Sequence, residues 1–197
     1  PALCLGGARP AYQRERWATP DGGEITVDRL PGRQGMPLLW LLHGLEGGSD
    51  SHYARALMRA AQARGWHGVV SHFRGCGGAV NTLPRAYHAG DSAEVAWLLA
   101  RLASEGRPVY AVGVSLGGNM LLKHLGEAGA SAPLCAAAAV SAPLDLAAAG
   151  RMLERGLARQ LYTRMFLRTL KPASLATARR HPGLIDVRRA QASRTLR

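Results

Sequence analysis

The pentapeptide Gly113-Val114-Ser115-Leu116-Gly117 constrains the fold of this chain more than any other feature. It follows an apolar run at 108–112 and opens a segment of helical periodicity that continues to Leu125. A G-x-S-x-G sequence between a strand and a helix is typical of a nucleophile elbow, whose sharp turn leaves no room for flanking side chains. The strained turn lifts the serine hydroxyl above the sheet. The pattern predicts a serine nucleophile at Ser115; the alternative is a glycine-rich turn without chemistry.

Apolar runs alternate with helical segments over the first 140 residues. We expect strands at 24–30, 37–42, 66–73, 108–112 and 134–140, and helices at 51–64, at 90–104 and after Ser115. The run at 37–42 is apolar without interruption, as strands buried on both faces are, and we expect the strands at 66–73 and 134–140 to be buried as well. This order with short connections predicts an α/β fold, a mostly parallel sheet with helices on both faces. Because ligands bind beyond the carboxyl ends of such strands, the glycine-rich loops 43–48 and 74–78 should meet Ser115 there.

The net charge of +12 is concentrated at the end of the chain. Residues 1–150 hold 13 basic and 11 acidic side chains, a net +2, whereas residues 151–197 hold 12 and 2, a net +10. The strand pattern also stops after Asp145, and 146–182 has helical character interrupted by Pro172 and Pro182. We therefore divide the chain into a core over 1–150 and a basic helical segment over 151–197. The charge suits nucleic acid, an anionic membrane surface or a solvated helical face; we favour the last, because no nucleic-acid motif accompanies it.

The cysteines, the lack of targeting signals in the sequence and its short apolar runs indicate where the protein resides and which chemistry it can perform. Three cysteines lie far apart, no signal peptide is visible, and no apolar stretch of about 18 residues occurs. These features favour a cytoplasmic protein, although the chain begins at Pro1 and an upstream segment stays open. No metal spacing and no nucleotide-binding fingerprint is present, so we expect no metal and no cofactor.

Five motifs in one order carry a family resemblance. They are His43-Gly44-Leu45-Glu46-Gly47, His72-Phe73-Arg74-Gly75-Cys76-Gly77, Tyr87-His88-Ala89-Gly90, Val112-Gly113-Val114-Ser115-Leu116-Gly117-Gly118-Asn119-Met120 and Val140-Ser141-Ala142-Pro143. With them the chain resembles the α/β-hydrolase superfamily, and within it the YheT-like branch of esterases and hydrolases. The resemblance covers essentially the whole chain and implies a carboxylic ester hydrolase with small-molecule or lipid-like ester substrates.

The resemblance also implies a role for each candidate residue. Ser115 would be the nucleophile, and the amides of Leu45 and Leu116 would form the oxyanion hole. Four residues of the two glycine-rich loops would line the substrate pocket: His43, Gly44, Arg74 and Gly75. For His43 we favour a role in orienting the loop over that of catalytic base. For Arg74, contact with an anionic substrate group and pinning of its own loop are equal alternatives. Cys76 lacks an elbow and is not expected to be a nucleophile.

The chain departs from the family after the elbow, where the triad order is nucleophile, acid and histidine. The acids beyond Ser115 are Glu127, Asp145, Glu154 and Asp186, and the histidines are His124 and His181. No strand-like segment follows Val140 to hold an acid or a histidine. We therefore expect a chain truncated within a helical cap, without its triad acid and base. Asp145 with His181 would keep the order and stays an alternative.

Three hypotheses about function follow. The first is a serine hydrolase that acts on acyl esters through an acyl-serine intermediate. The second is a catalytically inactive hydrolase-fold protein, and the third a binder of nucleic acid or an anionic surface through 151–197. We expect an ester substrate and no nucleic acid; peripheral membrane contact, acyl chain length and oligomeric state are left open.

Overall fold

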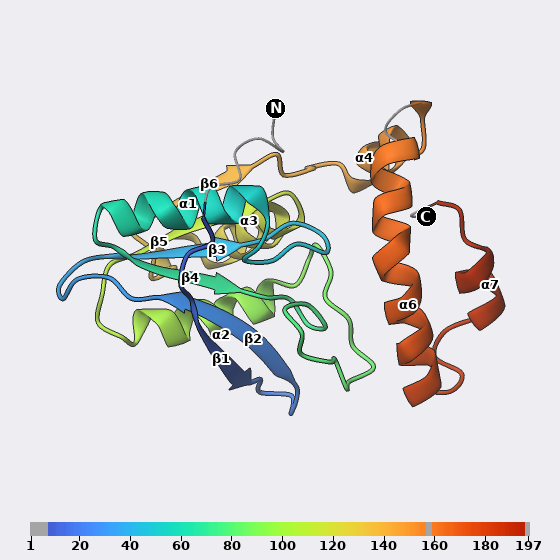
Figure 1. The fold of residues 1–197 in the computed structure, drawn as a ribbon, viewed down its shortest axis with the longest axis horizontal. Helices are drawn as coiled ribbons and strands as arrows, with labels where there is room; N and C mark the ends of the chain where they lie inside the picture. Colours follow the sequence, from blue (N-terminus) through green and yellow to red (C-terminus); the bar gives the residue numbers. More distant parts are fainter. Residues whose placement is uncertain (1–7, 157–158, 196–197) are drawn as a thin grey trace.

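A six-stranded sheet with helices on both faces forms most of the molecule (Figure 1). The computed structural model describes residues 8–156 and 159–195. The strands are β1 Gln13–Ala18, β2 Glu24–Leu30, β3 Leu38–Leu42, β4 His67–Ser71, β5 Val109–Val114 and β6 Ala136–Val140. The helices are α1 His52–Ala63, α2 Ser92–Ala103, α3 Leu116–Ala128, α4 Leu146–Leu153, α6 Arg164–Arg180 and α7 Val187–Ala192, with a 3₁₀ turn η2 Gly129–Ser131 and a π-helical turn η3 Arg159–Thr163.

The strand order is β1-β2-β4-β3-β5-β6, and the last four strands are parallel to one another. This arrangement confirms the predicted mostly parallel α/β sheet. The antiparallel β1–β2 hairpin completes one edge, and its turn includes Gly22 at φ 80°. The sequence analysis missed β1. Its only buried side chain is Trp17, and one buried residue does not establish a period of two.

The central strand β3 shows why its sequence is apolar without interruption. Leu39 and Leu41 pack on α1 at one face of the sheet, together with Met58. Trp40 and Leu42 belong to the core at the other face, which α2 and α3 cover. Because successive side chains of a strand point to opposite faces, a strand covered on both sides must be apolar at every position.

The prediction of a buried strand at 134–140 was wrong in one respect. The strand β6 forms, but all five of its residues, Ala-Ala-Ala-Ala-Val, are exposed. It is the outermost strand and pairs only with β5. The apolar composition of β6 therefore does not reflect burial by the described residues. With no further strand paired to it in the described part of the chain, β6 is an exposed edge strand.

Helix α6 stands beside the end of the sheet, and α7 lies against its far side (Figure 1). The expected interruption at Pro172 does not occur, because α6 continues through it to Arg180. Proline costs a helix one hydrogen bond, here the one to the carbonyl of Arg168, but does not always end it. None of the side chains of α6 is buried. No described helix combines the length and the apolar character needed to cross a membrane.

Candidate active site

Ser115 occupies the sharp turn between β5 and α3. Its backbone lies at φ 53° and ψ −117°, a conformation that side-chain-bearing residues rarely adopt. Its amide donates to the carbonyl of Val140 at 2.8 Å, and its carbonyl accepts from the Asn119 amide at 3.1 Å. These bonds hold the strained residue between the end of β6 and the first turn of α3.

The flanking glycines are required by close backbone contacts. A Cβ on Gly113 would lie 2.5 Å from the carbonyl oxygen of Gly117. A Cβ on Gly117 would lie 2.4 Å from the oxygen of Leu42 at the end of β3. Real Cβ atoms do not approach backbone atoms so closely. The start of α3 can therefore lie this near to β5 only with glycine at 113, and this near to the end of β3 only with glycine at 117.

The loop 43–48 runs directly beside the serine. A Cβ added to Gly44 would lie 3.3 Å from the Cβ of Ser115. Most amides of this loop already have acceptors: Gly44 donates to the Tyr53 hydroxyl, Glu46 to the Tyr87 hydroxyl, Gly47 to the Gly44 carbonyl and Gly48 to the Ser51 hydroxyl. The Leu45 amide has no acceptor among the described residues. Leu116 begins α3, where the amide has no acceptor within the helix.

His43 is fully buried, and both of its ring nitrogens are bonded to the backbone. Nδ1 donates to the Gly44 carbonyl at 2.7 Å, and Nε2 accepts from the Phe73 amide at 3.1 Å. Burial lowers the pKa of His43 to about 3, so the ring stays neutral at ordinary pH. These bonds orient the loop and leave neither nitrogen free to take a proton from Ser115.

Arg74 is also buried, and two carboxylates engage its guanidinium. Nε donates to Glu94 at 2.5 Å, and Nη2 donates to Asp21 at 3.1 Å. Burial raises the pKa of Glu94, against the effect of Arg74. The two acids compensate the charge of Arg74, which favours the pinning interpretation over a substrate contact. Gly75 follows at φ 79°, in the left-handed region that suits glycine.

A cavity of about 480 Å³ opens between these loops and α6. Leu45, Glu46, Arg74 and Tyr87 line it on the loop side. The remaining wall is mostly small or apolar, and includes Ala79, Val80, Pro84, Ala86, Leu170, Ala173, Ala176, Leu184 and Ile185, together with the polar Asn81, Ser174, Thr177 and Arg180. Gly75 also lines the cavity, whereas His43, Gly44 and Ser115 are not among its lining residues. The volume is in the range of small-molecule sites. A larger hollow of about 1210 Å³ lies between α6 and the C-terminal residues, is lined partly by arginine and lysine, and contains none of the predicted site residues.

A buried carboxylate that the sequence analysis missed anchors the far end of the 43–48 loop. Asp28 accepts from the Arg14 guanidinium at 2.7 Å, from Ser49 Oγ at 2.5 Å and from His72 Nε2 at 2.9 Å. Burial alone would raise the pKa of Asp28, but these hydrogen bonds hold it well below its usual range. A Cβ on Gly48 would lie 3.0 Å from the His72 ring, so the network packs directly on the loop.

The alternative pair of triad partners is engaged elsewhere. Asp145 accepts from the Ala148 amide as the N-cap of α4, and His181 bonds the carbonyl of Thr82. His124 is buried in α3, with its Nε2 unpartnered within the described residues. No hydrogen bond joins a histidine to the Ser115 hydroxyl in the part of the chain that the structure describes. In the same part, no cluster of three histidine, cysteine or carboxylate side chains could hold a metal ion.

The elbow, the adjoining loop and the sheet now permit comparison with known proteins. The family model described as alpha/beta hydrolase fold matches residues 37–180. The chain belongs to the α/β-hydrolase family. The matched range covers both glycine-rich loops, the elbow and all of α6. It therefore includes every residue that the sequence analysis placed at the site.

Curated relatives of this α/β hydrolase carry names of esterases and lipases. The Escherichia coli protein named "Putative esterase YheT" is 40% identical over 185 residues, which are 92% of this chain and 54% of that protein. Mouse "Phospholipase ABHD3" is 32% identical over 156 residues, 74% of this chain and 38% of that protein. This hydrolase chain thus spans about half the length of YheT. The fold is shared with the solved Pyrococcus furiosus esterase Pf2001, with a TM-score of 0.59 and 20% identity over 83% of this chain and 63% of that one.

Proposed function

We propose that this α/β hydrolase cleaves carboxylic esters through an acyl intermediate on Ser115. The observation that carries the proposal is the strained Ser115 at the β5–α3 turn, in contact with the loop that holds the unpaired Leu45 amide. A hydroxyl raised above a sheet beside two unpaired amides is the arrangement that acyl transfer requires.

The chemistry follows from that arrangement. Ser115 Oγ attacks the ester carbonyl carbon while its proton passes to a general base. The carbonyl oxygen becomes an oxyanion, which the amides of Leu45 and Leu116 stabilise; each such donor contributes about 2.7–4 kcal/mol to lowering the barrier. Collapse of the tetrahedral intermediate expels the alcohol, and water then releases the acid from the acyl-serine.

The general base is the missing part of this mechanism. The His43 ring is neutral and bonded at both nitrogens, and His181 bonds Thr82. We therefore infer that the described residues alone give slow turnover, because the Ser115 hydroxyl stays protonated. Serine hydrolases that lack triad members keep roughly 10³–10⁴-fold catalysis over water from the oxyanion hole and binding.

The cavity beside Leu45 supports an uncharged, lipid-like acyl ester as the substrate. Most of its lining residues are small or aliphatic, and the Arg74 charge is compensated by Glu94 and Asp21, while Arg180 of α6 adds one further cation to the lining. Relatives carry the names of a phospholipase and of a medium-chain fatty acid ethyl ester synthase/esterase. We propose that the core 1–150 supplies the nucleophile and the oxyanion donors and that 151–197 forms a cap over the acyl chain, with α6 as its inner wall.

Hydrolysis of p-nitrophenyl esters of increasing acyl length tests the proposal. We expect slow hydrolysis by the 197-residue chain, with higher kcat/KM for medium than for acetyl chains, since the cavity wall is apolar. Ser115→Ala should abolish the enzymatic part. Ser131→Ala, an exposed serine of η2, is the matched control and should change nothing. Equal rates for the chain and its Ser115→Ala variant would favour an inactive hydrolase-fold protein instead.

A further inference from the structure

We infer that the Tyr87 hydroxyl is a positioning group for the oxyanion hole, acting through Glu46. The inference rests on the proposed function, because it assigns a role in the same site. It also gives a role to the motif Tyr87-His88-Ala89-Gly90, which the chemistry of Ser115 does not use.

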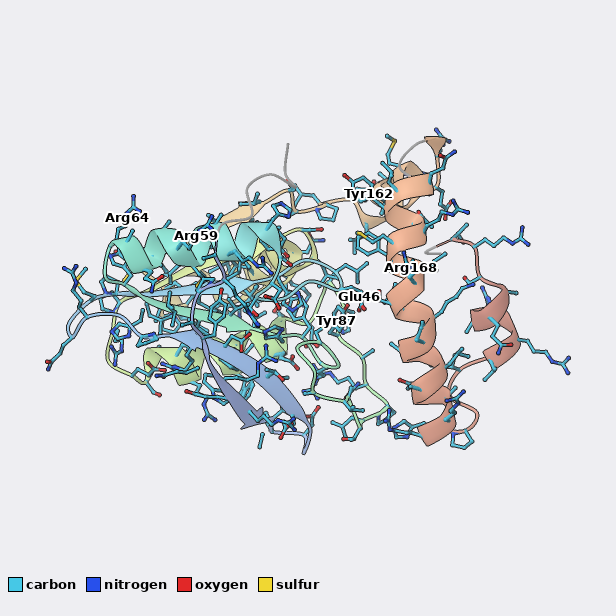
Figure 2. All side chains as sticks on the ribbon, viewed as in Figure 1. Glu46, Arg59, Arg64, Tyr87, Tyr162 and Arg168 are labelled. Atoms are coloured by element: carbon cyan, nitrogen blue, oxygen red, sulfur yellow. The ribbon has the colours of Figure 1, made fainter. Side chains whose placement is uncertain are left out.

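Two hydrogen bonds join Tyr87 to the residue that follows the oxyanion donor. The Tyr87 hydroxyl donates to Glu46 Oε1 at 2.5 Å and accepts from the Glu46 amide at 3.2 Å. One hydroxyl thus binds both the side chain and the backbone of a single residue. Figure 2 shows Glu46 and Tyr87 together between the sheet and α6.

Glu46 needs such support because its backbone is strained. Its φ is 53°, in the left-handed region that non-glycine residues seldom adopt. The Glu46 amide that Tyr87 binds belongs to the peptide plane next to the one that carries the Leu45 N–H, and only the φ and ψ of Leu45 separate the two planes. If the strain relaxed, the Leu45 N–H would turn away from the position where the oxyanion forms.

The Tyr87 ring is held in place by an aromatic neighbour. It stacks on the Phe73 ring, with the ring centroids 5.1 Å apart and an angle of 24° between the planes. Phe73 in turn lies 4.3 Å from the His43 ring, and its amide donates to His43 Nε2. The stack thus connects the two sides of Leu45: His43 binds the Gly44 carbonyl, and Tyr87 binds Glu46.

Charge and burial favour the bond between Tyr87 and Glu46. Burial raises the pKa of Tyr87 well above its usual range, and the nearby Cys76 and Glu46 act in the same direction. The phenol therefore stays protonated and donates to a carboxylate, the stronger kind of hydrogen bond. Cys76 stays a thiol as well, since burial raises its pKa to about 12.

Tyr87→Phe removes only the hydroxyl and keeps the ring stack. Hydrogen–deuterium exchange of the 43–48 amides in the full 197-residue chain is the decisive measurement. We expect exchange about tenfold faster in this loop, the effect of losing a bond to a charged partner, with no change in α2. Tyr110→Phe is the matched control, since its hydroxyl has no hydrogen bond within residues 8–156 and 159–195; it should leave the loop unchanged.

A double-mutant cycle separates this bond from a general loss of stability. Glu46→Met removes the carboxylate acceptor but keeps the bond from the Glu46 amide to the Tyr87 hydroxyl. The double variant with Tyr87→Phe should therefore exchange no faster than Tyr87→Phe alone, because the hydroxyl is already absent there. Additive effects, or unchanged exchange in Tyr87→Phe, would overturn the inference.

Ester hydrolysis gives a second readout. With Ser115-dependent turnover, Tyr87→Phe should lower kcat about tenfold and leave KM unchanged, as expected when oxyanion stabilisation alone is weakened. A rise in KM alone would make Tyr87 a substrate contact and refute a positioning role. If no variant shows Ser115-dependent turnover, the proposed function fails, while the exchange data still decide whether Tyr87 holds the loop.

Discussion

Replacing Gly117 by alanine should destabilise the fold although alanine favours helices. Gly117 lies in the first turn of α3, and a Cβ there would meet the carbonyl oxygens of Leu42 and His43 at 2.4 and 2.5 Å. Both contacts are backbone atoms, which cannot rotate away. The added methyl therefore forces α3 away from the end of β3, and the elbow moves with it.

The magnitude follows from two opposing effects. Alanine gains about 1 kcal/mol of helix propensity over glycine. Overpacking costs about 1–3 kcal/mol in ordinary cores, and a clash with rigid backbone lies at the top of that range. The free energy of unfolding should therefore fall by about 2 kcal/mol. With a urea m-value of about 2 kcal/mol/M, the midpoint should drop by about 1 M.

The same helix contains a matched control. Gly126 is exposed, and a Cβ there would have no atom within 4 Å. Gly126→Ala should therefore gain about 0.5–1 kcal/mol and raise the urea midpoint. Equilibrium urea denaturation followed by circular dichroism compares the two variants with the parent chain. A Gly117→Ala protein as stable as Gly126→Ala would refute the packing argument, whereas a variant too unstable to fold would support it.

Three further predictions concern pH, thiols and the exposed edge. The folded pKa of His43, about 3, lies below the unfolded value of 6.5, so the unfolded state binds more protons as the pH falls between these values. The free energy of unfolding should therefore fall by about 1.4 kcal/mol per pH unit below pH 6.5; urea titrations in which His43→Gln keeps the full slope would contradict this. Cys76, whose pKa burial raises to about 12, should react with iodoacetamide at pH 8 far more slowly than the exposed Cys135, as site-resolved mass spectrometry can measure. Ala137→Lys on the exposed β6 should reduce aggregation, measured by light scattering, without changing the melting temperature. Equal aggregation of the variant and the parent chain would show that aggregation does not occur through this strand edge.

The sequence predicted the elbow and its surroundings because their constraints are local. Gly113 and Gly117 are demanded by contacts within a few residues of Ser115 and by the end of one neighbouring strand. Uniformly apolar runs such as 38–42 likewise reveal a strand covered on both faces. Such features leave a signature in composition and spacing, so the α/β fold could be predicted before the topology was known.

The parts that failed depend on contacts distant in sequence. The burial of β6 could not be judged from its composition, since exposure depends on which strand lies beyond it. The roles of Tyr87 and Asp28 depend on partners 41 and 21 residues away, Glu46 and Ser49. The motif around Tyr87 carries no local signal of its partner, and nothing in the sequence near Asp28 indicates a buried anchor.

Fluorophosphonate labelling followed by peptide mass spectrometry tests the central claim most directly. The account predicts a slow adduct at Ser115 alone, because the elbow exposes the hydroxyl but no described histidine bonds it. Ser115→Ala should remove the adduct, and Ser131→Ala should not. An adduct of equal yield on another residue, unchanged in Ser115→Ala, would contradict the assignment of the nucleophile. Rapid labelling of Ser115 would instead place a working base within these 197 residues and contradict the expected incomplete triad.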